Sequence, residues 1–301
     1  MDLRKKFGKV ALLMGGDSPE REVSLRSGRA VAQALTELGI DKVEIDATSW
    51  DLVECLKAHR PDRCLIMLHG EAGENGGVQA LLKLLRIPYS GSDMSACALS
   101  MDKLLAKEIW QGKGLKTPNF SVLDDALSIT GLGFPLVVKP VDGGSSVGVS
   151  KVESVNTLKM AYHLAKKSYG SVMAEKWIEG DEFTVSIVGD VVLPSIRIEA
   201  PDTFYDYDAK YVTGSRYHCP SGVDEKTEQQ LKSIALAAYH SLGCRGWARV
   251  DFIQEAKTGA LFLIELNTVP GMTNLSLVPQ AAKVYGWDFN TLVLKILESA
   301  L

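Results

Sequence analysis

Strand-like and helix-like patterns alternate over the first ninety or so residues of this 301-residue chain. Apolar residues recur every three or four positions from Leu25 to Leu38, which is the spacing of a helix with one buried face. The same spacing returns twice more, after short strand-like runs bounded by turn residues. In order, the further segments are VALLM (10–14), KVEID (42–46), LVECLKAH (52–59), RCLIML (63–68) and VQALLKLL (78–85). This order predicts a parallel α/β lobe.

A different pattern follows residue 92. A helical KLLAKEIWQ precedes the strand-like runs FSVL and LVVK, and the run FTVSIVGDVVLPSIRI is interrupted by Gly189 and Asp190. A glycine and an aspartate between two alternating runs are typical of an antiparallel hairpin. We therefore expect antiparallel sheets here. The long segment 201–222 has no clear period, and its length favours a lid or binding loop over a plain surface connection.

The stretch 137–150, VVKPVDGGSSVGVS, has the composition of a phosphate-binding loop. Glycines allow backbone N–H groups to approach an anion closely, and serines add hydroxyl donors. Lys139 precedes the glycines, whereas the lysine of a P-loop follows them and opens a helix. The local pattern leaves two interpretations open, a glycine-rich flap between antiparallel strands and a plain hairpin.

The segment RVDFIQEAKTGALFLIELN predicts a hairpin with three oxygen-bearing side chains on one face. With the turn near its TG pair, Asp251 lies opposite Glu265, and Arg249 lies opposite Asn267. Opposed carboxylates repel each other unless a cation lies between them, and Asp, Glu and Asn oxygens suit Mg²⁺. The alternative is an exposed polar face balanced by Arg249. The opposite face is expected to hold Val250, Phe252, Ile264 and Leu266.

Composition and charge narrow the function classes. A net charge of −4 offers no basic field for a nucleic acid. The first apolar run is too short for a signal peptide, and no uncharged apolar segment approaches the roughly 18 residues of a membrane span. The five cysteines are odd in number and lack C-x-x-C spacing, which indicates reduced thiols in a cytoplasmic protein. Together with the flap and its lysines, the carboxylate hairpin indicates a phosphoryl-transfer or phosphate-activation enzyme.

A series of ordered motifs, spread over nearly the whole chain, closely resembles the D-alanine–D-alanine ligase family of the ATP-grasp superfamily. The motifs are GGDSPEREVSLRSG, LHGEAGENG, SMDK, VVKPVDGGSSVG, EKWIEGDEFTV, FYDYDAKY, GWARVDF and ELNTVPGMTNLSLVP. The resemblance implies an ATP-grasp fold of mixed α/β and α+β class. Its N-terminal parallel α/β lobe (1–92) would precede two α+β lobes (93–178 and 179–301) whose antiparallel sheets grip ATP.

The resemblance also implies the cofactor and nucleotide contacts. ATP would bind with two Mg²⁺ ions, for which Mn²⁺ can substitute, held by Asp251, Glu265 and Asn267. Lys103 and Lys139 would contact the α- and β-phosphates, Lys210 would reach the γ-phosphate, and the flap serines Ser145 and Ser146 would lie at that end of the nucleotide. The adenine-side segment and the ribose contact would be Glu175, Lys176, Trp177, Ile178 and Glu182.

For the substrates, the resemblance implies two D-alanine molecules joined through an acyl phosphate, as a step of peptidoglycan precursor synthesis. Glu20 would bind the first ammonium group, and Ser276 the second carboxylate. Arg249 and the backbone N–H of Gly271 would stabilise the tetrahedral oxyanion. His69 would contact substrate, and Tyr211 on the closing loop would favour an amine acceptor. A homodimer is expected, with no nucleic-acid or membrane partner.

Several residues keep a structural interpretation beside the functional one. Glu20 fits the first turn of a helix on dipole grounds alone, His69 fits a satisfied loop histidine, and Ser276 fits an ordinary N-cap. Ala248 stands where relatives carry glycine. The competing functions are another carboxylate–amine ligase, a D-alanine–D-lactate ligase and a non-catalytic ATP-binding sensor. A dinucleotide-binding oxidoreductase is disfavoured because GGDSPE lacks the G-x-G-x-x-G spacing.

Overall fold

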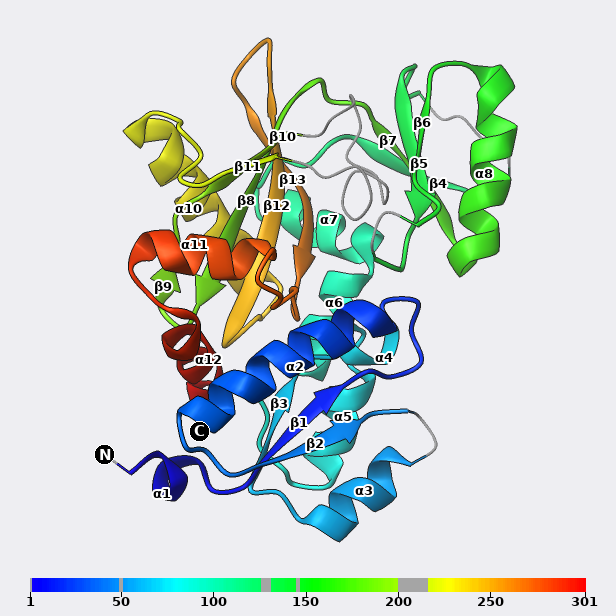
Figure 1. Ribbon diagram of the computed structural model, residues 1–301. Helices are drawn as coiled ribbons and strands as arrows, with labels where there is room; N and C mark the ends of the chain where they lie inside the picture. The colour runs from blue at the N-terminus through cyan, green and yellow to red at the C-terminus, as the bar shows by residue number, and fades with distance from the viewer. Residues whose placement is uncertain (1, 49–50, 126–130, 145–146, 200–215) are drawn as a thin grey trace.

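The computed structural model describes residues 2–48, 51–125, 131–144, 147–199 and 216–301, in which three sheets are present (Figure 1). The first sheet is parallel throughout and has the strand order β2-β1-β3, which confirms the predicted parallel α/β lobe. Its strands are β1 (Val10–Met14), β2 (Lys42–Asp46) and β3 (Arg63–Ile66). Its helices are α1 (Leu3–Phe7), α2 (Arg21–Glu37), α3 (Leu52–His59), α4 (Glu71–Glu74) and α5 (Gly77–Leu84).

Helix α2 packs closely on the central strand of this sheet. Its buried residues include Gly28, Val31 and Leu35, which share one helical face. A Cβ atom at Gly28 would lie 2.4 Å from the sulfur of Met14 on β1, so only glycine permits this approach. The packing fixes the N-terminal end of α2, and Glu20 directly before it, relative to the sheet.

The second sheet has the order β4-β7-β5-β6 and is antiparallel. Helix α8 packs on it through buried residues such as Leu158 and Ala165, which share a core with Leu136 and Val138 of β5. Strands β5 and β6 pair with each other, so the glycine-rich stretch connects two antiparallel strands. The elements are β4 (Phe120–Leu123), β5 (Leu136–Pro140), β6 (Ser150–Val152), α8 (Val155–Tyr169) and β7 (Val172–Lys176).

The third sheet has the order β11-β10-β8-β12-β13, with β9 paired to β8. Its pairs are antiparallel, as predicted, and α10 covers its apolar face after an N-cap at Asp224, whose side chain accepts from the N–H of Thr227. The strands are β8 (Gly180–Val188), β9 (Val191–Val192), β10 (Ile196–Glu199), β11 (Arg216–His218), β12 (Trp247–Glu255) and β13 (Leu261–Asn267). The helices are α6 (Met94–Met101), α7 (Lys103–Gly112) and α10 (Glu225–Ser241).

The register of the β12–β13 hairpin confirms the predicted pairs on its polar face. Asp251 lies opposite Glu265, and Arg249 lies opposite Asn267. The prediction for Ile264 was wrong, because an irregularity after Asp251 places Phe252 opposite Leu263. A β-bulge of this kind shifts the alternation by one residue. Ile264 is therefore only half-buried and lies on the polar face.

The last two helices join the first lobe to the third sheet. Helix α12 (Phe289–Glu298) packs on α2, and α11 (Leu277–Tyr285) packs on α12 and on β8 (Figure 1). Their buried residues, among them Val278, Leu292 and Ile296, belong to the same apolar core as β1 and α2. This core ties the loop before α11 to the first lobe. None of the helices in the described part of the chain combines the length and apolar character that a membrane span needs.

Candidate functional site

One cavity of about 490 Å³ is lined by strands of the second and third sheets and by α2 and loop residues of the first lobe. It contains most of the described residues that the sequence predicts for a site. They are Glu20, His69, Lys103, Lys139, Glu175, Trp177, Glu182, Arg249, Asp251, Glu265, Asn267, Gly271 and Ser276. Lys176 and Ile178 do not line it. Ser145, Ser146, Lys210 and Tyr211 lie outside the described residues.

The glycine-rich stretch contributes to the cavity wall. Gly143, Gly144 and Val147 line the cavity together with Lys139 at the end of β5. Their position on the cavity wall favours the interpretation as a glycine-rich flap over that as a plain hairpin, since a plain hairpin need not line a cavity. Lys103 at the start of α7 donates to the carbonyl oxygen of Gly143 at 2.5 Å and so holds the flap to that helix.

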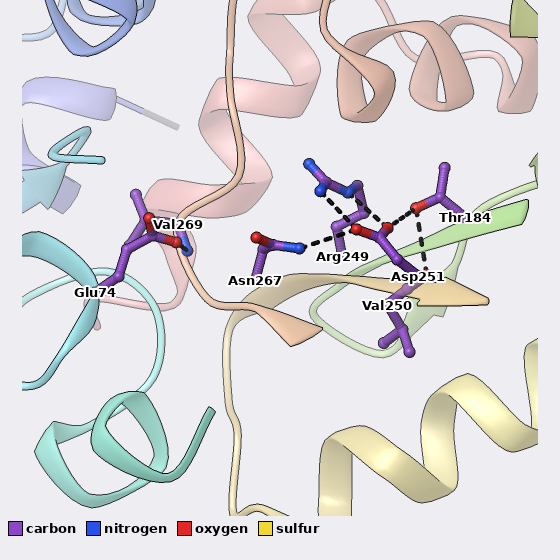
Figure 2. Close-up of polar contacts among 7 residues, drawn as sticks. All are labelled: Glu74, Thr184, Arg249, Val250, Asp251, Asn267 and Val269. Atoms are coloured by element: carbon purple, nitrogen blue, oxygen red, sulfur yellow. Dashed lines mark hydrogen bonds and ion pairs between the residues drawn. The ribbon is translucent and has the colours of Figure 1, made fainter. Parts of the chain in front are cut away.

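The polar face of β12 and β13 forms another wall (Figure 2). The guanidinium of Arg249 makes a bidentate interaction with the Asp251 carboxylate, from Nε to Oδ1 at 2.8 Å and from Nη2 to Oδ2 at 2.7 Å. Thr184 donates to Oδ1 at 2.6 Å, and the amide of Asn267 donates to Oδ2 at 3.1 Å. Asp251 is thus fixed in orientation by three neighbours. Glu265, across the strand pair, faces the same cavity.

The buried lysines Lys103 and Lys139 line the same cavity as these carboxylates. The Nζ atom of Lys139 lies 2.6 Å from Oε1 of Glu175, and both side chains are buried. Burial lowers the pKa of Lys103, while the negative charge of Glu265 opposes that shift. Lys107, one turn after Lys103 on α7, also pairs with Glu175 at 3.0 Å. The sequence analysis missed Lys107, although its spacing from Lys103 places both on one helical face.

Glu20 lies against the backbone of two glycines. A Cβ atom at Gly70 would lie 2.5 Å from its Oε2 atom, and one at Gly144 would lie 3.1 Å from it. Glu20 is the N-cap residue of α2, yet its side chain makes no capping hydrogen bond. Glu20 therefore lies directly before α2 and not within its first turn, and it lines the cavity.

The loop before α11 also lines the cavity. Ser276 is the N-cap residue of α11 but makes no side-chain bond to the helix. Its hydroxyl instead accepts from the N–H of Thr273 at 2.9 Å and shares a hydrogen bond of 2.9 Å with the Thr273 hydroxyl. A Cβ atom at Gly271 would lie 2.9 Å from Oγ of Ser276, so a larger residue there would displace the Ser276 hydroxyl. Both residues face the cavity.

His69 is buried and fully hydrogen-bonded. Its Nδ1 lies 2.8 Å from the carbonyl oxygen of Val269, and its Nε2 lies 2.9 Å from Oγ of Ser27. A carbonyl only accepts, so Nδ1 carries the proton, and Ser27 donates to Nε2. Burial lowers the pKa of His69 and favours this neutral form. His69 therefore joins the end of β3 to the loop after β13 and also lines the cavity.

Glu74 is a cavity residue that the sequence analysis missed. Its carboxylate accepts from the N–H of Gly70 at 2.7 Å and from the N–H of Val269 at 3.2 Å, the second contact being drawn in Figure 2. Burial, and next the charge of Glu20, raise the pKa of Glu74 to about 8. The signal that could have found it is the second acidic residue of the GEAGENG motif.

The raised pKa of Glu74 predicts a pH-dependent stability. The folded state binds the proton of the Glu74 carboxyl more tightly than the unfolded state does. The stability that this proton binding adds to the fold is therefore fully present below the unfolded pKa and is lost as pH rises through about 8. Glu74→Gln should therefore gain thermal stability relative to the parent chain between pH 5 and pH 9, by at most about 1.4 kcal/mol per pH unit. Calorimetric melting curves across this range measure it. Exposed Glu22→Gln on α2 is the control; a Glu74→Gln difference that stays flat with pH contradicts the prediction.

Comparison with known proteins gives one consistent result. A protein-family model described as the D-ala D-ala ligase C-terminus matches residues 109–298. The D-alanine–D-alanine ligase of Stutzerimonas stutzeri is 49% identical over 302 aligned residues, which cover 99% of this chain and 96% of that protein.

Solved structures agree. The crystal structure of the D-alanine–D-alanine ligase of Bacillus anthracis complexed with ATP has a TM-score of 0.83 at 33% identity and covers 97% of both chains. The VanG D-Ala:D-Ser ligase of Enterococcus faecalis has a TM-score of 0.85 at 28% identity, over 97% of this chain and 99% of that one.

Proposed function

The chain belongs to the D-alanine–D-alanine ligase family, with the ATP-grasp fold, and we propose how its cavity carries out the reaction. It is an ATP-dependent ligase that joins two D-alanine molecules into D-alanyl-D-alanine. The observation that carries the proposal is the cavity itself, which is lined by Asp251, Glu265 and Asn267 together with the buried lysines Lys103 and Lys139. A cavity with carboxylates and lysines suits a nucleoside triphosphate and its metal counter-ions.

The residues of the carboxylate wall fit Mg²⁺. Asp251 and Glu265 lie directly opposite each other, the amide of Asn267 donates to Asp251, and all three oxygen-bearing residues line the cavity. We assign these three residues to two Mg²⁺ ions, for which Mn²⁺ can substitute. When bound, the ions would neutralise phosphate charge and polarise the transferring group. The two hydrogen bonds from the Arg249 guanidinium hold the Asp251 carboxylate in place.

The nucleotide would lie between this wall and the flap. Lys139 and Lys103 would contact its α- and β-phosphates, since both are buried lysines at the cavity surface. Trp177 and Glu182 line the cavity at the start of β8 and would lie near the adenine and ribose. Lys176 and Ile178 would contribute through the backbone of the same segment. The roles of Ser145, Ser146, Lys210 and Tyr211 rest on the family resemblance.

The chemistry proceeds in two balanced steps. A carboxylate oxygen of the first D-alanine attacks the γ-phosphorus, and ADP leaves with the electrons of the broken P–O bond. The neutral amine of the second D-alanine then attacks the acyl-phosphate carbonyl, inorganic phosphate leaves with the former carboxylate oxygen, and the proton released by the amine nitrogen passes to that phosphate. Arg249 and the N–H of Gly271 would hold the developing oxyanion. Glu20 would bind the first ammonium group, and Ser276 the second carboxylate.

Further expectations remain part of the proposal. The lobes would divide at residues 92 and 178, and the enzyme would act as a cytoplasmic homodimer in peptidoglycan precursor synthesis. The five cysteines, all free thiols, support a reducing compartment. The net charge of −4 supports small molecules rather than nucleic acid as partners.

An acceptor comparison tests the proposed specificity. The enzyme is incubated with ATP, Mg²⁺ and D-alanine, and then with D-serine or D-lactate as a competing second substrate, and products are separated by mass spectrometry. D-Alanyl-D-alanine should form in proportion to ADP and should remain the main product. A predominance of the mixed D-serine dipeptide or of the D-lactate ester would overturn the assignment.

Glu20 provides a test of the donor subsite. Glu20→Gln removes the charge proposed for the first ammonium group, so the KM for D-alanine should rise about 10- to 100-fold, the loss of one charged hydrogen bond. The KM for ATP should change little. Steady-state kinetics with each substrate varied separates the two effects. The matched control is Glu22→Gln on the exposed face of the same helix. Equal changes in both KM values would indicate a structural role instead.

A further inference from the structure

Lys107 is fully buried on α7, yet it is not part of the cavity wall. We infer that Lys107 is a positioning residue for nucleotide binding, acting through the carboxylate that it shares with Lys139. This inference rests on the proposed nucleotide site. It assigns Lys107 a function that the cavity residues alone do not indicate.

Three buried charges form a compact cluster, which we call the Lys107–Glu175–Lys139 cluster. Oε1 of Glu175 lies 3.0 Å from Nζ of Lys107 and 2.6 Å from Nζ of Lys139. The exposed fractions of the three side chains are 0%, 3% and 5% in chain order from Lys107 to Glu175 to Lys139. Solvent screening is therefore weak, and each charge acts strongly on the others.

Lys107 is held at this place by neutral partners from other elements. Its Nζ donates to Oγ1 of Thr117 at 2.6 Å and to the carbonyl oxygen of Leu263 at 3.4 Å. The Thr117 hydroxyl in turn donates to the same carbonyl at 2.8 Å. Leu263 lies on β13, two residues before Glu265. Lys107 thus joins α7, β7 and the strand of the carboxylate wall.

The charge balance of the cluster points to an anionic ligand. One carboxylate and one lysine would already form a neutral buried pair, and a second buried lysine costs desolvation free energy without improving that pair. With Lys107 present, Glu175 divides its attraction between two cations, and the cluster keeps one net positive charge. Lys139 and Glu175 line the cavity, so this charge is presented there. A nucleotide phosphate is the ligand that would use it.

Removing the charge of Lys107 should therefore leave Lys139 neutralised by Glu175. The Kd of ADP, measured by calorimetry with Mg²⁺ present, should rise about tenfold or more in Lys107→Met, because the poorly screened charge of Glu175 would then act on Lys139 alone. Lys107→Arg should retain most of the affinity. The KM for D-alanine should stay near the parent value.

A double-mutant cycle separates this role from a structural one. In the Glu175→Gln background Lys139 is no longer paired with a carboxylate, so adding Lys107→Met should raise the Kd of ADP only slightly. Lys107→Gln, which keeps a donor for Thr117, serves if Lys107→Met does not fold. An equal rise in Kd in both backgrounds, or an unchanged Kd in Lys107→Met, overturns the inference. Failure of the parent chain to bind ADP would instead contradict the proposed function.

Discussion

Replacing Glu265 by glutamine should lower kcat for dipeptide formation by about 10²- to 10³-fold, the typical loss for one preorganised electrostatic contact. Glu265 lies opposite Asp251 on the cavity wall, so the change removes one of the two opposed carboxylates. Glutamine has the same shape, which keeps the hairpin intact. Measurement of both ADP and dipeptide checks the result. Varying the Mg²⁺ concentration should show that the variant binds the metal more weakly than the parent does.

The matched control for Glu265→Gln lies on the same hairpin. Glu255 ends β12, and its carboxylate accepts from the hydroxyl of Thr258 in the turn, away from the cavity. Glu255→Gln should leave kcat within a factor of about two, since surface changes of this kind have small effects. If Glu265→Gln retained the parent rate, the hairpin could not be the metal site.

Arg249→Lys should reduce kcat by about 10²-fold, although the positive charge is retained. The guanidinium of Arg249 binds Asp251 with two parallel bonds of 2.8 and 2.7 Å, and the single ammonium of lysine cannot reproduce this fork. Asp251 would lose its fixed orientation, and the oxyanion would lose a donor. Stopped-time assays of dipeptide at saturating ATP and D-alanine measure kcat directly.

The control for Arg249→Lys is a second arginine beside the same sheet. Arg245 contacts the ring face of Tyr89 and donates to the carbonyl oxygen of Ser299, but it does not line the cavity. Arg245→Lys can lower the melting temperature without changing kcat. A parent-like kcat in Arg249→Lys would show that a positive charge alone suffices at this position and that the bidentate interaction with Asp251 is not needed for catalysis.

The polar face of the hairpin could be predicted because strand alternation is a local property. Asp251, Glu265, Arg249 and Asn267 obey it, and their pairing follows from the position of one turn. Ile264 could not be predicted, because a β-bulge depends on how the strands twist against their neighbours. An apolar residue in an alternating run is expected on the core face unless the register shifts.

Other parts of the site depend on contacts between distant segments. Lys107, Thr117, Glu175 and Leu263 meet through four different parts of the chain, so no local spacing reveals the buried cluster. The GEAGENG motif draws attention to Glu74, but the contact of its carboxylate with the backbone of Val269 is seen only in the fold. The packing of α12 on the first lobe could not be predicted from the sequence either, since its apolar face could pack on any buried apolar surface.

The most direct test of the acyl-phosphate mechanism follows one oxygen atom. The enzyme is incubated with ATP, Mg²⁺ and D-alanine labelled with ¹⁸O in both carboxylate positions, and the inorganic phosphate is analysed by mass spectrometry. The account predicts one ¹⁸O atom in each phosphate and one D-alanyl-D-alanine for each ADP. Unlabelled phosphate, or ADP released without dipeptide, would contradict it.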